Sequence, residues 1–288
     1  MTDLTVVIPS FNAAGTITLQ LDALAAQETS RAWELIVADN GSTDGTPGIA
    51  ASYEPRLPGL RVIDASAKRG PAYALNEGAR AARGASLLFC DADDEVAPHW
   101  LEAMGDALEH HDLVASRQDV ERLNDPWVRE SRGPSLMAED VMRLPFPPYL
   151  RHAPSSGLGV RRTRHEEIGG FDESLPTLYD TDYCIRLHRF GIEPVLVPDA
   201  LVHYRYRPEL KAIFRQARSY AEGSARLQKR YATGRPFAVW RWPAKHWRPV
   251  LTELSRSHRR GSRARLAWLV GWQVGRYAGS ARYRVLAV

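Results

Sequence analysis

The chain has 288 residues, of which 44% are hydrophobic and 25% are charged, and its net charge is +4. These values are ordinary for a soluble globular protein, and the presence of only two cysteines excludes a disulfide framework. No run of about 18 apolar residues is present to cross a membrane, and the N-terminus lacks the pattern of a signal peptide. The sequence therefore predicts a cytoplasmic protein in which Cys90 and Cys184 are reduced core residues.

The charge is divided unevenly along the chain. Residues 226–288 carry thirteen Arg and two Lys against one acid, Glu253, so this part has a net charge of +14 and leaves −10 for residues 1–225. Such a division indicates an acidic body with a basic appendage that binds anions. Five of the eight tryptophans belong to the same appendage: Trp240, Trp242, Trp247, Trp268 and Trp272.

In the first half of the chain, short β-rich runs alternate with helical patterns. Strands are expected at residues 4–9, 34–39, 60–66, 85–90 and 112–116. Helices are expected at residues 17–24, 46–53, 71–83 and 98–110. This alternation predicts an α/β fold with a mostly parallel sheet and helices on both faces. In such sheets, ligands bind at the carboxyl ends of the strands.

The second half is less regular. Residues 119–154 are rich in proline and predict a long functional loop with one short helix at 138–143. A strand, a glycine turn, a helix, a strand and a long amphipathic helix follow at 157–161, 169–173, 180–190, 193–198 and 210–227. These patterns predict a body of residues 1–230 and a helical, basic, Trp- and Arg-rich tail of residues 231–288.

Three aspartates follow the strand at 85–90, in the segment FCDADDEV. Asp91, Asp93 and Asp94 repel one another unless their charge is solvated or neutralised. Two interpretations are open at this point. The segment can be a solvated turn that caps the next helix, or its carboxylates can bind a divalent cation.

Seven segments, in order and at suitable spacing, resemble glycosyltransferase family 2, whose members have the GT-A fold. The resemblance covers residues 4–207, and any one segment alone would carry little weight. It implies a nucleotide-sugar-dependent, inverting enzyme with a nucleotide-binding half at 1–118 and an acceptor-binding half at 119–230. The segments are VVIPSFNA, ADNGSTDGT, KRGPAYALNEGARAARG, LLFCDADD, GGFDE, DTDYCIRLHRFG and PDALVHYR.

The resemblance implies a site for Mg²⁺ or Mn²⁺. Asp93 takes the place of a direct metal ligand, Asp91 reaches the ribose or the metal, and His203 stands where the family often supplies a third ligand. A hard cation held by carboxylates offsets the charge of a nucleoside diphosphate, which acidic side chains alone would repel.

The resemblance also implies a nucleotide pocket. Asp39 would accept a hydrogen bond from the base, which favours a uracil N–H group and hence UDP. Asn40 stands where the family usually has a second acid. For Asn12 and Ser42, ordinary helix and turn capping is the alternative. The remaining residues implied in this pocket are Pro9, Ser10, Arg69 and Asn76.

Asp180 aligns with the family's general base, while Tyr179 replaces the Glu that usually precedes it. A carboxylate within hydrogen-bond reach of a hydroxyl acceptor removes its proton as the new bond forms, typically for a factor of about 10²–10⁴ in rate. The alternative is that Asp180 only caps the following helix. Asp182 would point away from the site if this segment is helical.

The tail has three interpretations. Trp and Arg side chains favour contact with an anionic membrane surface, which is the interpretation preferred here. Gly271, Gly275 and Gly279 recur at four-residue spacing and also permit close helix packing or a homo-oligomer. Nucleic-acid binding is the least favoured of the three.

Together these features predict a metal-dependent inverting glycosyltransferase. The donor would be a UDP-sugar, and the acceptor a hydroxyl of a glycan, a lipid-linked sugar or a small-molecule glycoside. Two alternatives stay open: a non-catalytic nucleotide-sugar-binding or membrane or nucleic-acid adaptor protein, and a retaining transferase of related fold. A sugar nucleotidyltransferase is disfavoured because the Gly-rich loop with a following Lys is absent.

Overall fold

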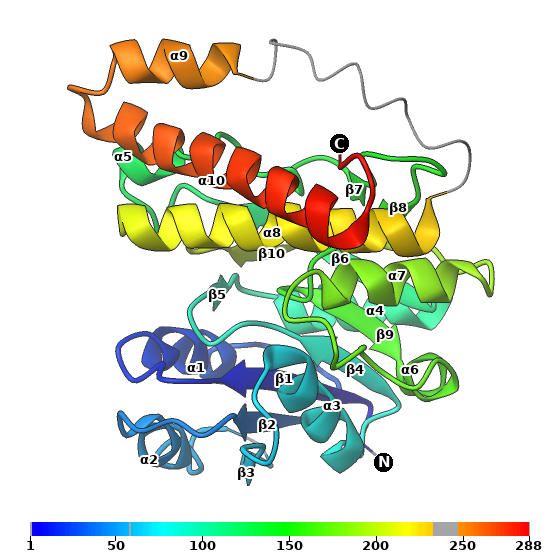
Figure 1. Cartoon of the computed structure of the whole chain (residues 1–288). Coiled ribbons are helices and arrows are strands. Elements are labelled where there is room, and N and C mark those ends of the chain that lie inside the picture. The colour runs from blue at the N-terminus through cyan, green and yellow to red at the C-terminus, as the bar shows by residue number, and fades with distance from the viewer. Residues whose placement is uncertain (1, 58, 233–246, 288) are drawn as a thin grey trace. The chain divides into compact units, whose positions relative to one another are not determined.

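The computed structural model describes residues 2–57, 59–232 and 247–287 (Figure 1). The chain forms two compact units, each built from segments that are separate in the sequence. The first unit consists of Met1–Asp119, Leu136–Met142 and Arg151–Tyr204. The second unit consists of Val120–Ser135, Arg143–Leu150 and Arg205–Val288.

An eight-stranded sheet forms the centre of the first unit, in the order β3-β2-β1-β4-β9-β6-β10-β5. Pairing is parallel among β3, β2, β1 and β4 and between β6 and β10, whereas β9 is antiparallel to both of its neighbours and β5 is antiparallel to β10. The predicted α/β fold is confirmed, with antiparallel strands added to a parallel framework. The strands are β1 (Leu4–Ser10), β2 (Trp33–Asp39), β3 (Arg61–Asp64), β4 (Ser86–Phe89), β5 (Glu95–Val96), β6 (Leu113–Asp119), β9 (Leu158–Arg161) and β10 (Val195–His203).

Hydrophobic clusters cover both faces of this sheet. Successive side chains of a strand point to opposite faces, so Val6 packs in one cluster and Val7 in the other. Leu21 of α1 and Trp100 of α4 belong to the cluster of Val6, and Leu75 of α3 belongs to that of Val7. The helices are α1 (Ile17–Ala25), α2 (Thr46–Ala51), α3 (Pro71–Ala81), α4 (Trp100–His110), α6 (Arg162–Glu167) and α7 (Tyr179–His188).

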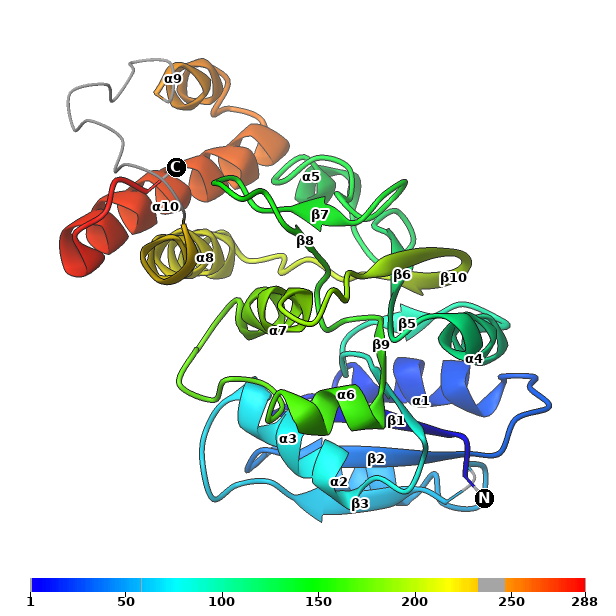
Figure 2. The ribbon, with the colours of Figure 1, turned by 90° about the vertical axis from the view of Figure 1, so that its right-hand side faces the viewer.

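The second unit contains α5 (Pro126–Arg129), α8 (Leu210–Tyr231), α9 (Arg248–Ser255) and α10 (Arg260–Tyr283). Figures 1 and 2 both show α10 lying along α8. The two backbones approach closely because α10 presents glycines to α8: a Cβ added at Gly275 would lie 2.2 Å from the carbonyl oxygen of Arg218. Gly271 and Gly279 meet Ala217 and Ala225 of α8 in the same way. The packing interpretation of the glycine repeat is therefore realised within one chain.

The segment before α8 is tied to α10 by an arginine between two aromatic rings. The guanidinium carbon of Arg132 lies 4.4 Å from the ring centroid of Tyr206 and 4.4 Å from that of Trp268. The ring of Trp268 also stacks on that of Trp272, with 6.1 Å between the ring centroids. These two tail tryptophans are thus partly buried packing residues of the second unit.

Two expectations about organisation differ from the structure. The prediction of a short helix at 138–143 is wrong, because β7 (Met142–Arg143) lies there and pairs with β8 (Arg151–His152). The break between compact units falls after Tyr204 instead of at residue 230, which groups α8 with the tail helices. Trp240 and Trp242 lie outside the described residues. Cys90 and Cys184 are free and buried, as expected.

Candidate active site

The carboxyl ends of five strands meet at one edge of the sheet. β1, β2 and β4 run parallel, and β6 has the same direction as β4 because both are antiparallel to β9 between them. β10 is parallel to β6. Ser10, Asp39, Phe89, Asp119 and His203, which end these strands, therefore lie along the same edge, where ligands bind in open α/β sheets.

Asp39 is buried at the end of β2 and accepts four hydrogen bonds. The backbone N–H groups of Gly41 and Ser42 donate to Oδ2 at 3.2 and 2.9 Å, and the hydroxyls of Ser10 and Ser42 donate to Oδ1 at 3.2 and 2.5 Å. A carboxylate has about four lone-pair positions, so these donors occupy them. A base N–H group would reach Asp39 by replacing a hydroxyl donor, because hydroxyls can rotate away and backbone groups cannot.

Asn12 and Ser42 join the loops that follow β1 and β2. The backbone N–H of Asn12 donates to Ser42 Oγ, and Asn12 Oδ1 accepts from the N–H of Thr43, both at 2.9 Å. The loop-capping alternative thus describes both side chains as they stand. Asn12 has a φ of 50°, a left-handed conformation that Asn tolerates better than most residues.

An exposed aromatic residue beside Asn12 was missed by the motif analysis. Phe11 is 47% exposed, and the guanidinium carbon of Arg69 lies 5.2 Å from its ring centroid. A large ring left in solvent at the ligand edge offers a stacking surface. The signal in the sequence was an aromatic residue directly after the strand, between Ser10 and Asn12.

Asn40 organises the loop that presents Arg69. Its amide nitrogen donates to the carbonyls of Ala65 and Lys68, and its Oδ1 accepts from the N–H of Gly70 at 2.8 Å. A carboxylate at this position has no hydrogen to donate to the two carbonyls. The substitution of the family's acid by Asn therefore fits a structural role in this chain.

Asn76 does not fit the nucleotide contact that was expected of it. It is buried on α3, and its amide nitrogen donates to the carbonyl of Phe171 and to Glu173, both at 2.9 Å. Its Oδ1 accepts from the N–H of Phe171 at 2.8 Å. Because both amide hydrogens are used inside the protein, Asn76 holds the turn at 169–173, and we omit it from the nucleotide contacts.

The aspartate segment forms the turn between β4 and β5. Asp91 and Asp93 are partly exposed there, whereas Asp94 is buried. β5 pairs with β10 so that Glu95 stands opposite His203. The turn therefore lies next to the end of β10. The carboxylates and the imidazole that were expected to bind the metal thus belong to neighbouring elements.

His203 is oriented by a carboxylate that the motif analysis did not identify. Its Nδ1 lies 2.9 Å from Oδ2 of Asp119, its direct partner in the pairing of β10 with β6. An ionised carboxylate only accepts, so Nδ1 carries the proton and Nε2 is the nitrogen that can bind a metal. Metal-binding histidines commonly have such a carboxylate partner.

The donor set therefore suits Mg²⁺ or Mn²⁺ in chemical type, with Asp93 and Asp91 as oxygen ligands and His203 as a nitrogen ligand. Within residues 2–57, 59–232 and 247–287, no three His, Cys, Asp or Glu side chains already converge into a metal-binding group. The metal ligands thus stay a prediction supported by the type and the placement of these residues.

Asp180 lies in the first turn of α7 and is partly buried. Its Oδ2 accepts from the backbone N–H of Ser155 at 3.1 Å, and its Oδ1 accepts from that of Thr181 at 2.8 Å. Burial raises the pKa of Asp180 above its ordinary value, although these hydrogen bonds act in the opposite direction. A carboxylate with a raised pKa is a stronger base for a hydroxyl proton.

Asp180 is also connected to the ligand edge of the sheet. Ser155 is two residues from Gly157, whose N–H donates to the carbonyl of Phe89 at 2.8 Å, directly before Cys90 and Asp91. Asp180 is not the N-cap residue of α7, because that position is Leu178. The simple capping alternative therefore does not describe it.

The side chain of Asp182 points away from that of Asp180, as expected for two residues that are two positions apart in a helix. It is fully buried and pairs with Arg186 at 2.7 Å, and the same arginine donates to the carbonyls of Ile168 and Gly170. This network fixes the glycine turn against α7.

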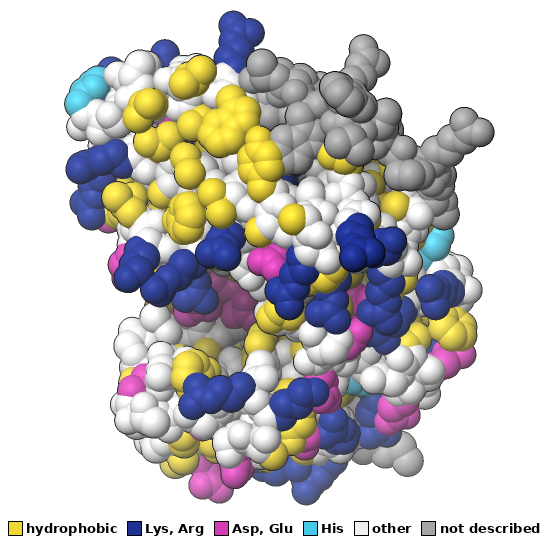
Figure 3. All heavy atoms as spheres, in the orientation of Figure 1, with side chains coloured by type: hydrophobic (Ala, Val, Ile, Leu, Met, Phe, Trp, Pro, Cys, Tyr) yellow, Lys and Arg dark blue, Asp and Glu magenta, His cyan; other side chains and the backbone are white. Residues whose placement is uncertain are grey.

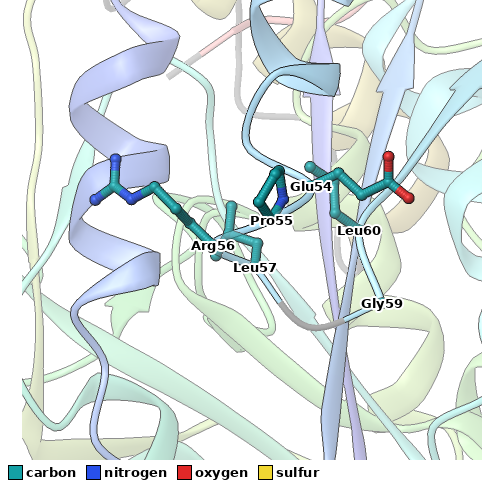
Figure 4. A pocket seen from close by; sticks show the side chains of 6 residues that line it. All are labelled: Glu54, Pro55, Arg56, Leu57, Gly59 and Leu60. Atoms are coloured by element: carbon teal, nitrogen blue, oxygen red, sulfur yellow. The ribbon is translucent and has the colours of Figure 1, made fainter.

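The pocket in Figure 4 lies away from this edge. It is formed by the loop between α2 and β3, at the amino end of β3, whereas the residues described above follow the carboxyl ends of the strands. Its lining residues are Glu54, Pro55, Arg56, Leu57, Gly59 and Leu60. None of them is a residue singled out by the motifs.

Comparison with known proteins identifies the family. The family model described as glycosyl transferase family 2 matches residues 5–169. The chain belongs to glycosyl transferase family 2. Among family members, it is 32% identical over 168 residues to the uncharacterized glycosyltransferase YibD of Escherichia coli, covering 56% of this chain and 46% of that protein.

Other relatives support the same assignment. Validoxylamine A glucosyltransferase of Streptomyces hygroscopicus is 30% identical over 223 residues, which cover 66% of this chain and 52% of that protein. The chain thus spans about half the length of these curated relatives.

Solved structures share the fold. Staphylococcus aureus TarS 1–349 in complex with UDP-GlcNAc aligns with a TM-score of 0.57 at 17% identity, covering 99% of this chain and 93% of that one. The mannosyltransferase PcManGT from Pyrobaculum calidifontis, in complex with GDP-Man and Mn²⁺, aligns with a TM-score of 0.60 at 20% identity, covering 98% and 77%. The expected GT-A-type fold is confirmed.

Proposed function

We propose that this chain is a metal-dependent, inverting glycosyltransferase that moves a sugar from a UDP-sugar to a hydroxyl acceptor. Family membership supports glycosyl transfer. The observation that supports the mechanism is the partly buried carboxylate of Asp180, whose pKa is raised by burial and which accepts a hydrogen bond from the backbone N–H of Ser155. A glycan, a lipid-linked sugar and a small-molecule glycoside all supply the required hydroxyl.

In this proposal the donor nucleotide lies along the ends of β1 and β2. Phe11 stacks on the base, Asp39 accepts its N–H in exchange for a hydroxyl donor, and Arg69 adds positive charge beside the phosphates. Pro9 and Asn12 shape the loop. The complex of TarS with UDP-GlcNAc supports a uracil base, whereas PcManGT binds GDP-Man, so both donor types belong in the test.

Transfer would proceed by a single in-line displacement. Asp180 takes the proton of the acceptor hydroxyl while its oxygen bonds to the anomeric carbon, and the bond from that carbon to the diphosphate breaks with its electron pair leaving on UDP. One displacement inverts the configuration. Mg²⁺ or Mn²⁺ bound by Asp93, Asp91 and His203 would supply charge neutralisation for the diphosphate.

Two alternatives are distinguishable by product analysis. A non-catalytic nucleotide-sugar-binding protein would bind donor without turnover, and a retaining enzyme would give a product of unchanged anomeric configuration. Neither needs a base at Asp180. We also propose that residues 231–288 contact an anionic membrane surface from the cytoplasmic side. A homo-oligomer would be compatible with this contact.

The metal assignment predicts the behaviour of Asp93→Ala. With Mn²⁺ present, a UDP-sugar at 100 times its Kd should stabilise the wild type by about 2.7 kcal/mol. Asp93→Ala should lose the Mn²⁺-dependent part of this shift in a thermal unfolding assay. Asp106→Ala, at an exposed position on α4, is the matched control and should behave as wild type. Full transfer activity after complete chelation would contradict the assignment.

The pair of Asp119 and His203 leads to a second prediction. Asp119→Asn should weaken Mn²⁺ binding about 10–100-fold in calorimetry of the UDP-bound enzyme, because an amide lacks the negative charge of the carboxylate and, being a donor as well as an acceptor, no longer requires the proton to be on Nδ1. Asp112→Asn changes the carboxylate just before the other end of β6, where it pairs with Arg164, and should leave Mn²⁺ affinity unchanged. Equal affinity of Asp119→Asn and wild type would remove Asp119 from the site.

A further inference from the structure

α9 and α10 expose large apolar side chains at the surface of the second unit. Leu251 is 64% exposed and Leu254 is 55% exposed, although both are helical leucines that would ordinarily be covered. We call the following set the apolar face of the tail helices: Trp247, Leu251, Leu254, Val274 and Tyr277. In Figure 3, hydrophobic side chains gather over α9 and α10, with Lys and Arg side chains along their lower border.

This face is continuous across the two helices. Trp247, Leu251 and Leu254 follow one another at spacings of four and three residues and therefore share one side of α9, and Val250 at the flank of this side is buried. The indole N–H of Trp247 donates to the hydroxyl of Tyr277 on α10 at 3.2 Å, and their ring centroids are 6.3 Å apart.

The charge of these two helices is predominantly positive. Residues 247–287 contain nine arginines and one acid, Glu253, whose carboxylate lies 3.8 Å from Arg265. Arg276 is buried with the carbonyl of Ala287, and Arg282 pairs with Glu222 of α8, so these two are used inside the unit. Besides Arg282, the exposed arginines are Arg248, Arg256, Arg259, Arg260, Arg263 and Arg284.

We propose that the apolar face of the tail helices docks on the surface of an anionic lipid bilayer. Apolar side chains on one side of a helix, with arginines around them, are the composition of helices that lie in the membrane interface. Trp and Tyr favour the headgroup level, and arginines are attracted to anionic lipids. No helix in the described part of the chain has the length and apolarity to cross a bilayer.

Other occupants fit this face less well. A symmetric contact with a second copy would bring the arginines of both chains together, and like charges across an interface oppose association. Single-stranded nucleic acid binds by stacking bases on aromatic rings, whereas the two most exposed members of this face, Leu251 and Leu254, are aliphatic and only Trp247 and Tyr277 offer rings. A bilayer accepts aliphatic and aromatic side chains together and supplies the anions.

This inference extends the proposed function. Membrane docking itself does not depend on glycosyl transfer, but the conclusion below about the acceptor rests on the proposed function. An enzyme held at a bilayer surface meets acceptors whose hydroxyl is carried on a lipid anchor. Surface attachment therefore favours the lipid-linked class among the three acceptor classes. Lipid binding and donor binding are measured separately, so failure of one is distinguishable from failure of the other.

The test uses the full-length protein with two kinds of vesicle, one of phosphatidylcholine alone and one that also contains phosphatidylglycerol. The protein should co-sediment with the anionic vesicles at least about tenfold more strongly, and high salt should release part of it, because charge attraction is screened while apolar insertion is not. Equal binding to both vesicles, or no binding to either, would overturn the proposal.

A paired variant locates the face. Leu251→Asp with Leu254→Asp should weaken binding to anionic vesicles at least about tenfold, because two carboxylates replace apolar side chains in the interface. Phe190→Asp, which changes a side chain with similar exposure of 52% beyond the end of α7, is the matched control and should bind as wild type. UDP-sugar-induced thermal stabilisation should be the same in all three proteins, which also shows that they are folded.

Two results with the paired variant would overturn the proposal. One is wild-type vesicle binding by a folded variant. The other is a wild-type dimer in light scattering that the variant converts to a monomer, which would assign the face to a second copy. If the variant does not fold, Leu251→Gln with Leu254→Gln replaces it, with the same expected loss.

Discussion

Asp180→Asn is expected to lower kcat by about 10²–10⁴-fold while the affinity for the donor stays nearly unchanged. The amide is almost the same size as the carboxylate, and its oxygen can still accept from the N–H of Ser155. It cannot take a proton from the acceptor hydroxyl. Steady-state transfer assays with a saturating donor, together with donor calorimetry, measure the two effects.

The dependence of transfer on pH supplies an independent check. Burial raises the pKa of Asp180, so the acidic limb of kcat/KM should lie above the ordinary Asp pKa of about 3.9. The base works only when deprotonated; transfer is therefore present above the raised pKa and is lost as the pH falls through it. This limb should disappear from the residual activity of Asp180→Asn.

Asp182→Asn is the matched control on the same helix. Asp182 is buried and pairs with Arg186, so breaking the pair should destabilise the protein by about 3–5 kcal/mol. Its kcat per folded molecule should stay near that of wild type. The inverting mechanism would be contradicted if Asp180→Asn kept most of its kcat, or if the product retained the anomeric configuration.

Gly275→Ala is expected to destabilise the helical unit by about 1–3 kcal/mol, although alanine favours helices. A Cβ at this position would lie 2.2 Å from the carbonyl oxygen of Arg218 and 2.8 Å from Cβ of Ala221, so α8 and α10 must separate to admit it. Denaturant unfolding followed by tryptophan fluorescence measures the change, since Trp268 and Trp272 belong to α10.

Gly48→Ala in α2 is the corresponding control, because a Cβ there meets no atom within 4 Å. It should stabilise the protein by up to about 1 kcal/mol through helix propensity. Equal effects of the two substitutions would mean that the contact between α8 and α10 contributes little. The same contact predicts that a chain ending near Tyr231 exposes the buried face of α8, including Ala217 and Ala221, and loses stability.

Residues whose role depends on near neighbours in the sequence could be found from the sequence. The β-rich run of β1, the helical pattern of α3 and the amphipathic pattern of α8 predicted the right elements within a few residues. Asp39 ends β2 and Asp91 follows β4, and a parallel sheet gathers such carboxyl ends at one edge. These patterns are local: they depend on the two- and 3.6-residue periods of strands and helices.

What depends on which segments come together could not be read from the sequence. β9 inserts antiparallel between β4 and β6, and Asp119 meets His203 from 84 residues away. Asn76 matches a nucleotide motif, yet it bonds to Phe171, 95 residues further on. The glycines of α10 could equally have faced a bilayer, another chain or α8. Only the tertiary structure decided these questions, because the free energy of such pairings is spread over contacts between distant segments and leaves no period in either one.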